Sequence, residues 1–330
     1  MRTILKLASM MSVITFMPAP QATAADGKLQ VVASFSIIAD FARNVGGDRV
    51  DITTLVGPDG DAHVYEPKPA DAGAVSKADV VLVNGLQFEG FLQRLVEASG
   101  TKAPVVELTK GGEVLSFAEE AHDHDATKPE AGHDHAHDAA KEGKHAHEAG
   151  HDHGAFDPHA WQSVHNAEVY VKNIVDAFCA ADAAGCASYT ANGAAYGAKL
   201  AELETAIKTS IAAIPADKRT IITSHDAFGY FEHEYGLNFL APEGVSTESE
   251  ASAADVAALI KQIREDKAAA IFVESITNPR LIEQIASETG IKVGGTLYSD
   301  ALSGPEGPAA TYIDMMTHNV STITGAIGGS

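Results

Sequence analysis

Short apolar runs rich in Val, Ile and Leu alternate with helix-like segments in two separate parts of the chain. In the first part the runs predict strands at 28–34, 49–57, 78–85 and 103–108. In the second part they predict strands at 219–225, 237–244, 268–275 and 291–298. Near-continuous apolar strands separated by helices are typical of parallel sheets that are covered on both faces.

Between the two parts the apolar positions change to a helical period. From Ala187 to Ile214 they recur at intervals of three, four and seven residues, namely Tyr189, Tyr196, Leu200, Leu203, Ile207, Ile211 and Ile214. A helix of that length would span about 42 Å at 1.5 Å per residue. The pattern predicts an α/β protein of two lobes, each a mainly parallel sheet flanked by helices. We place the N-terminal lobe at 25–186, the linker helix at 187–214 and the C-terminal lobe at 215–330.

The first 24 residues have the features of a secretory signal peptide. Arg2 and Lys6 precede an apolar core at 7–17, and Ala22-Thr23-Ala24 forms a cleavage site. We therefore expect export and cleavage after Ala24, without a lipid anchor, because no cysteine follows the apolar core. The formal net charge of −22 argues against nucleic acid or an anionic membrane as a partner.

The chain has two cysteines, Cys179 and Cys186. An oxidising compartment favours a disulfide between them. In one unbroken helix residues seven apart are separated by about 10.5 Å along the axis, beyond disulfide reach. A bond therefore requires a turn, for which Gly185 is suited. Two free thiols remain the alternative, and a zinc site built on these cysteines is disfavoured because no second pair exists.

Residues 118–154 consist almost wholly of His, Asp, Glu, Ala, Gly and Lys, and we expect a disordered loop there. The sequence HEAGH at 147–151 matches the zinc-protease signature, but Gly150 interrupts it and no amphipathic pattern surrounds it. Histidine-rich segments bind Zn²⁺ and similar ions weakly, and a solvated spacer is the alternative. The predicted auxiliary zinc ligands are His122, His124, His133, His135, His137, His145, His147, His151 and His153.

Four other residues stand where loops follow strands or where the histidine-rich segment ends. His63 follows the second strand, His159 lies just after the histidine-rich segment, and His225 ends the first strand of the second half. Asp300 follows the last predicted strand. Residues at the carboxyl ends of parallel strands face a common crevice. Three imidazoles and one carboxylate suit tetrahedral Zn²⁺, so we predict a metal site between the lobes, although each residue alone has a structural explanation.

The motifs around these residues carry a family resemblance over essentially the whole mature chain. They are HVYEP at 63–67, DPHAW at 157–161, SHDAF at 224–228 and YSD at 298–300. The chain resembles the metal-binding periplasmic solute-binding proteins of ABC importers, specifically their ZnuA- and AztC-like zinc branch. The resemblance implies that His63, His159, His225 and Asp300 are the metal ligands. It also implies a two-lobed fold with a long linker helix, and manganese members of the family have Glu in place of His225.

The resemblance further implies a function without enzymatic activity. A periplasmic protein would capture Zn²⁺ and deliver it to an ABC permease with its ATPase subunit, and we expect a monomer. The histidine-rich segment would either gather zinc or accept it from a periplasmic metallochaperone. The alternatives are an exported zinc hydrolase using Glu66 or Glu148 as base, and a metal-buffering protein or adhesin without a transporter.

Three further residues, Glu66 inside the HVYEP motif and two histidines outside the motifs, have other expected roles. Glu66 could be an alternate ligand, a turn residue or, as we favour, a carboxylate that contacts a ligating imidazole and orients it. His165 and His233 lie on helix-like segments and are expected to be surface or packing residues.

Overall fold

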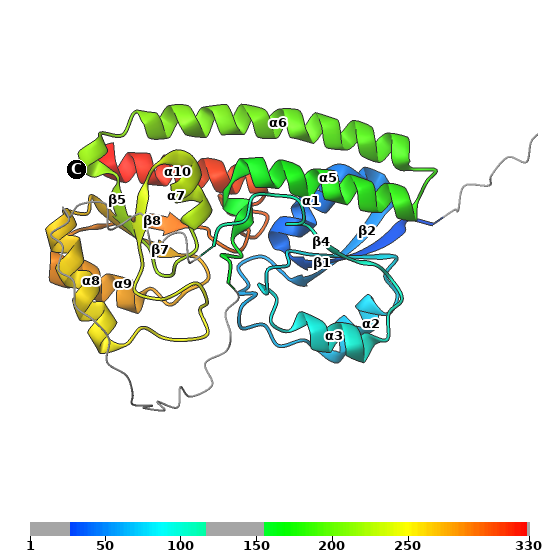
Figure 1. Ribbon diagram of the computed structural model, residues 1–330, viewed down its shortest axis with the longest axis horizontal. Helices are drawn as coiled ribbons and strands as arrows, with labels where there is room; N and C mark the ends of the chain where they lie inside the picture. Colours follow the sequence, from blue (N-terminus) through cyan, green and yellow to red (C-terminus); the bar gives the residue numbers. More distant parts are fainter. Residues whose placement is uncertain (1–26, 117–154, 329–330) are drawn as a thin grey trace, which may run out of the picture.

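The computed structural model describes residues 27–116 and 155–328. The predicted signal peptide and the histidine-rich segment at 118–154 lie outside the described residues. Two four-stranded parallel sheets lie side by side, one in each lobe, and helices surround them (Figure 1). This confirms the predicted α/β class and its two parallel sheets.

The first sheet has the strand order β2-β1-β3-β4. Its strands are β1 (Leu29–Phe35), β2 (Val50–Val56), β3 (Val80–Val83) and β4 (Val105–Glu107). Its helices are α1 (Ser36–Gly46), η1 (Gly47–Arg49), α2 (Pro69–Val75) and α3 (Leu92–Ser99). All four side chains of β3 are buried, as expected for a central strand of a sheet covered on both faces.

The second sheet repeats this arrangement with the order β6-β5-β7-β8. Its strands are β5 (Thr220–Ile222), β6 (Asn238–Leu240), β7 (Ala270–Glu274) and β8 (Val293–Leu297). Its helices are η3 (Ala216–Lys218), α7 (Gly229–Tyr235), α8 (Ala253–Asp266) and α9 (Arg280–Thr289). In each sheet the second strand in sequence lies on one side of the first strand, and the third strand lies on its other side. Such a reversal of strand order creates a crevice at the carboxyl ends of the strands.

Three long helices lie on one side of the two sheets (Figure 1). α5 (Val164–Ala181) follows the short η2 (Ala160–Gln162), and α6 (Cys186–Ala212) runs along the top of the molecule over both lobes (Figure 1). α6 begins one residue before the predicted start and ends two residues before the predicted end. It packs against α5, α1 and the last helix, α10 (Tyr312–Gly328).

The start of α10 packs against α1 of the first lobe, a contact that the sequence pattern does not predict. The ring of Tyr312, at the start of α10, lies 4.7 Å from that of Phe41 in α1. Its backbone N–H also donates to Asp40 at 3.0 Å. One continuous apolar core therefore runs from the first sheet through α5, α6 and α10 to the second sheet.

The two cysteines lie on either side of the turn between α5 and α6. A disulfide joins Cys179 to Cys186, as predicted, and the chain turns between Ala181 and Cys186. In the described parts of the chain, no helix combines the length and apolar character that crossing a bilayer requires.

Candidate metal centre

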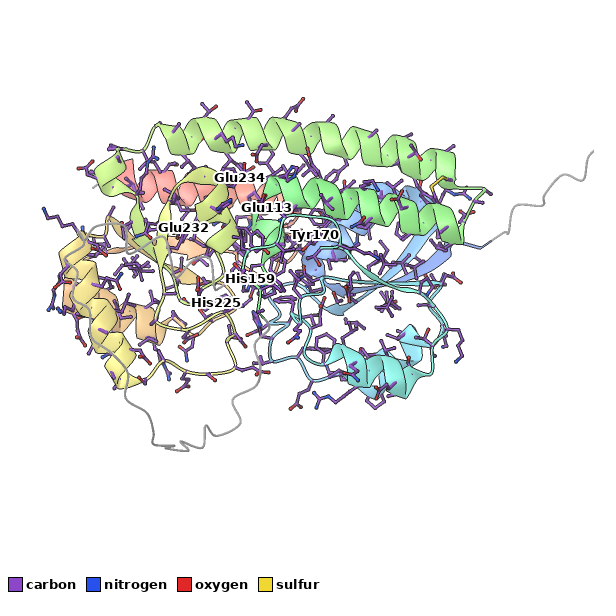
Figure 2. All side chains as sticks on the ribbon, viewed as in Figure 1. Glu113, His159, Tyr170, His225, Glu232 and Glu234 are labelled. Atoms are coloured by element: carbon purple, nitrogen blue, oxygen red, sulfur yellow. A yellow bond between two sulfur atoms is a disulfide. The ribbon has the colours of Figure 1, made fainter. Side chains whose placement is uncertain are left out.

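The four predicted ligands come together between the lobes. His63 lies in the loop after β2, and His159 immediately precedes η2. His225 and Asp300 each follow a strand of the second sheet, β5 and β8 respectively. His159 and His225 lie close together in the middle of the molecule, below the long helices (Figure 2). Parallel-strand geometry thus brings residues 237 positions apart in sequence, His63 and Asp300, to one point.

The distances among the ligand atoms match those of a small tetrahedral ion. His63 Nε2 lies 3.4 Å from His159 Nε2 and 3.2 Å from Asp300 Oδ2, while His225 Nε2 lies 3.1 Å from the same oxygen. All four ligand atoms lie within 4.8 Å of one another. Tetrahedral Zn²⁺ with bonds of about 2.0–2.1 Å separates its ligand atoms by about 3.3 Å. The group therefore has the size that such an ion requires.

Burial isolates this group from solvent. His159, His225 and Asp300 are 0% exposed, and His63 is 9% exposed. Among the described residues, Asp300 Oδ1 has no hydrogen-bond donor, although it is buried. Buried carboxylate oxygens are normally satisfied by a donor or a cation, so this oxygen fits a metal-binding role.

Two further carboxylates hold two of the imidazoles from behind. Asp157 Oδ1 lies 2.7 Å from His159 Nδ1, and Glu274 Oε2 lies 2.7 Å from His225 Nδ1. The contact at His159 is a hydrogen bond, and the contact at His225 is an ion pair. A carboxylate behind Nδ1 directs Nε2 toward the centre and raises its basicity. Both Nε2 atoms are thereby oriented toward the other ligands.

The pKa values of three ligands are shifted by their mutual charges. Burial alone would lower the pKa of His225, but the charges of Glu274 and Asp300 outweigh it and raise that pKa well above its ordinary value. Burial also opposes charge on His159, whose pKa is nevertheless raised by Asp300 and Asp157. Burial would raise the pKa of Asp300, yet His225 and His159 hold it well below its ordinary value. The group therefore stabilises positive charge at its centre, either as protons or as a metal ion.

Aromatic rings form the wall of the site on the side of the first lobe. The Phe88 ring lies 4.8 Å from that of His63, and the Trp161 ring lies 5.3 Å from that of His159. Phe88 follows a tight loop in which Leu86 and Gln87 have φ values of 53° and 64°. This apolar wall keeps the dielectric low around the ligands, which strengthens their attraction for a cation.

Glu66, which we expected to orient an imidazole, has an exposed side chain. It lies in the turn before α2, where Tyr65 donates to Asp71 and the Lys68 backbone N–H also donates to Asp71. In the part of the chain that the structure describes, Asp157 and Glu274 are the carboxylates that contact imidazole Nδ1 atoms at the site.

The two carboxylates differ in how visible they are in the sequence. Asp157 belongs to the DPHAW motif, whose predicted ligand is His159. Glu274 lies outside the four motifs, and its signal is a single Glu at the end of the apolar run AAAIFV, because a buried carboxylate needs a partner.

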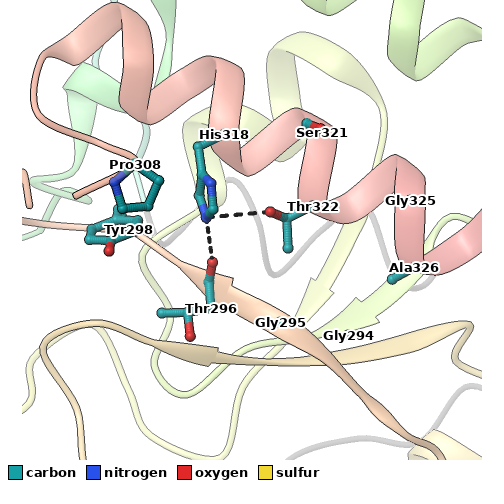
Figure 3. A pocket seen from close by; sticks show the side chains of 10 residues that line it. All are labelled: Gly294, Gly295, Thr296, Tyr298, Pro308, His318, Ser321, Thr322, Gly325 and Ala326. Atoms are coloured by element: carbon teal, nitrogen blue, oxygen red, sulfur yellow. Dashed lines mark hydrogen bonds between the residues drawn. The ribbon is translucent and has the colours of Figure 1, made fainter. Parts of the chain in front are cut away.

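The other histidines among the described residues are not part of this group. His165 is exposed, and His233 Nε2 lies 3.4 Å from Glu113 Oε1 at the surface. His318 lines a surface hollow of about 480 Å³ between β8 and α10 (Figure 3). Its Nε2 lies 3.0 Å from the carbonyl oxygen of Thr296, so it helps to hold α10 on β8. The nine histidines of the 118–154 segment lie outside the described residues.

Comparison with known proteins agrees with this geometry. Residues 31–326 match the family model described as ZnuA, zinc-uptake complex component A, periplasmic. The chain is 33% identical to the manganese-binding lipoprotein MntA of Halalkalibacterium halodurans, over 92% of this chain and 91% of MntA. It is 31% identical to the iron-binding protein YfeA of Yersinia pestis, over 91% and 87% of the two chains. The structure of the periplasmic zinc-binding protein TroA of Treponema pallidum aligns with a TM-score of 0.77 at 29% identity, covering 91% of this chain and 99% of TroA.

Proposed function

This chain belongs to the ZnuA family of periplasmic metal-binding proteins of ABC importers, and we propose that the metal it captures is Zn²⁺. The family consists of substrate-binding proteins rather than enzymes, and its importers contain a permease and an ATPase. Membership of the family does not by itself identify the metal, because relatives of similar sequence identity are named for manganese and for iron.

The donor set is the observation that carries the proposal. Three imidazole nitrogens and one carboxylate oxygen lie within 4.8 Å of one another, and three of these pairs are 3.1–3.4 Å apart. Imidazole suits Zn²⁺, whereas Mn²⁺ favours oxygen-rich sites with more ligands. His63, His159, His225 and Asp300 are accordingly the proposed ligands, with Asp157 and Glu274 as their supports.

Four protein ligands also suit a carrier. A catalytic zinc site keeps one coordination position for water or substrate, while a closed site holds the ion without reacting. A buried group of four donors fills the tetrahedral set, which supports capture and later release rather than hydrolysis.

The proposal extends to the cellular context of the chain. We propose that residues 1–24 direct export to the periplasm and are removed after Ala24, and that the mature protein works as a monomer. The 118–154 segment would supply weak additional zinc sites, either gathering the ion or accepting it from a metallochaperone.

A competition titration tests the choice of metal and the place of the tight site. Zn²⁺, Mn²⁺ and Fe²⁺ are titrated against a chelator into the mature chain, 25–330, and into a variant that lacks 118–154. We expect one tight site that prefers Zn²⁺ in both proteins and weak additional sites in the mature chain only. Tighter binding of Mn²⁺ or Fe²⁺ would overturn the zinc assignment, and loss of the tight site in the shortened variant would overturn the ligand assignment.

A further inference from the structure

The four proposed ligands are not held equally firmly. His159 and His225 are each backed by a carboxylate, as described above. Asp300 is held through its neighbour Ser299, whose carbonyl oxygen accepts hydrogen bonds from Trp161 Nε1 and Gln162 Nε2, each at 2.8 Å. All three ligands are therefore fixed by buried contacts.

His63 differs from the other three. It is the most exposed of the four ligands, and the next residue, Val64, is 49% exposed. Within the described residues its side chain has one carboxylate at ion-pair distance, the ligand Asp300 itself. Its position depends instead on its backbone N–H, which donates to Asp61 Oδ1 at 2.9 Å.

Asp61 connects this loop to the opposite lobe. Its second oxygen, Oδ2, accepts a hydrogen bond of 2.6 Å from Thr247 Oγ1, in the loop after β6. The loop after β6 is also bound to the segment after β5 that carries the ligand His225. Glu243 forms a parallel β-bridge with His225, and the Asp226 backbone N–H donates to the carbonyl oxygen of Gly244. Hydrogen bonds and backbone thus connect His225 to His63 across the two lobes.

A wide separation of the lobes is not an available route for metal release. The apolar core is continuous between them, and α6 and α10 pack against each other behind both. The loop after β2 is also anchored at its start, where the Asp59 backbone N–H donates to the carbonyl oxygen of Leu302 at 2.9 Å. The segment from Gly60 to His63 is left as the part that can move without breaking the core.

We propose that the hydrogen bond between Asp61 and Thr247 is a latch that keeps His63 on the metal and so sets the lifetime of the bound ion. This inference rests on the proposed function, since it assumes that the four residues hold Zn²⁺. When the latch opens, His63 leaves with its loop, and the ion keeps three ligands that cannot retain it for long. Asp61 and Thr247 are positioning residues, because neither touches the ion.

The test measures zinc dissociation and association separately, by stopped-flow mixing of the mature zinc-loaded protein with a chelator and of the metal-free protein with zinc. Thr247→Val removes the hydroxyl and keeps the shape of the side chain, whereas Thr247→Ser keeps the hydroxyl. A hydrogen bond to a charged acceptor is strong enough for its loss to accelerate dissociation about tenfold. Association should change by less than about twofold, because the open form of the loop is the one that admits the ion. Thr247→Ser should dissociate at the rate of the unmodified protein.

Two controls keep the outcome decisive. Thr205→Val removes an exposed hydroxyl that donates to the carbonyl oxygen of Ala201 within α6, and it should leave both rates unchanged. Asp61→Asn weakens the same latch from the other side and should also accelerate dissociation, so the test survives if Thr247→Val does not fold. Unchanged dissociation in both latch variants, or equally fast dissociation in Thr247→Ser, would overturn the latch. Weak zinc binding by the unmodified protein would instead overturn the proposed function.

Discussion

Glu274 makes three contacts with His225 and the residue before it, Ser224. Its Oε2 lies 2.7 Å from His225 Nδ1, and its Oε1 accepts the backbone N–H groups of Ser224 and His225 at 2.7 and 2.8 Å. Glu274 ends β7, the strand next to β5, so the sheet itself delivers this carboxylate to the base of the imidazole. The ring orientation of His225 is therefore set by the pairing of two neighbouring strands.

The first prediction concerns this support. Glu274→Gln retains an oxygen for the backbone N–H groups but loses the charge that makes His225 a stronger ligand. We expect zinc affinity to fall about 10- to 100-fold, as is usual when a carboxylate behind a ligating histidine is lost. Competition titration against a chelator measures the change. Glu283→Gln, at an exposed position on α9, is the matched control and should bind like the unmodified protein. Equal affinities in the two variants would contradict the role of Glu274.

The second prediction concerns the ligand itself. His225→Ala should weaken the tight site by about a thousandfold or more, because three remaining donors chelate far less effectively than four. His165→Ala, which removes an exposed histidine, should leave the affinity unchanged. Unchanged zinc affinity in His225→Ala would remove His225 from the ligand set.

The third prediction tests the basis of metal preference at the same position. His225→Glu converts the donor set to two nitrogens and two carboxylates, which favours Mn²⁺ relative to Zn²⁺. We expect the ratio of zinc to manganese affinity to fall by at least about tenfold. Parallel titrations of the two metals measure that ratio, and an unchanged ratio would show that the identity of residue 225 does not set the preference.

The sequence predicted the fold because both halves follow local rules. The apolar runs of the strands and the helical period from Tyr189 to Ile211 are visible without knowledge of any contact. Glycine is unfavourable within a helix, yet Gly193 lies inside α6. A Cβ atom there would lie 2.5 Å from a methyl group of Val175, so glycine permits the close approach of α5 and α6.

What escaped prediction depends on contacts between distant segments. Glu274 supports a histidine 49 residues earlier in the chain, and Thr247 reaches Asp61 across 186 residues. Tyr312 packs on Phe41 across the two lobes. No local pattern encodes such pairs, because register and lobe packing determine them. The four proposed ligands could be predicted from the sequence because each lies in a recognisable motif or directly after a predicted strand.

The fourth prediction concerns the disulfide at the turn between α5 and α6. Replacing Cys179 and Cys186 by alanine should lower the free energy of unfolding by about 2–3 kcal/mol, the contribution of a bond that closes a short loop. The turn keeps other contacts, since Asp182 accepts hydrogen bonds from Arg49 and Tyr189, each at 2.8 Å. Zinc affinity should not change, because the turn lies at the end of the long helices, away from His159 and His225 (Figure 2). Urea denaturation and titration measure the two effects, and a loss of affinity would link the turn to the site.

The last prediction follows from the charges at the site. In the metal-free protein the neighbouring carboxylates raise the pKa values of His159 and His225, so both imidazoles hold a proton to higher pH than a free imidazole does. The two protonated imidazoles and the carboxylates of Asp157, Glu274 and Asp300 together carry one excess negative charge. Zinc binding must displace both protons, and the divalent ion restores the same net charge. Metal binding is therefore an exchange of one ion for about two protons.

The sign of the pH dependence follows from this exchange. Because protons compete with the ion below the raised pKa values, the logarithm of zinc affinity should rise by about two for each pH unit there and level off above them. Calorimetry in buffers of different ionisation enthalpy counts the protons directly. Above the ordinary imidazole pKa of about 6.5, unshifted imidazoles would release few protons, whereas this site should release more because the pKa values of His159 and His225 are raised. Glu274→Gln removes the charge that contributes most to raising the pKa of His225, so it should release fewer protons than the unmodified protein. Equal proton release by the two proteins would show that Glu274 does not raise the pKa of His225.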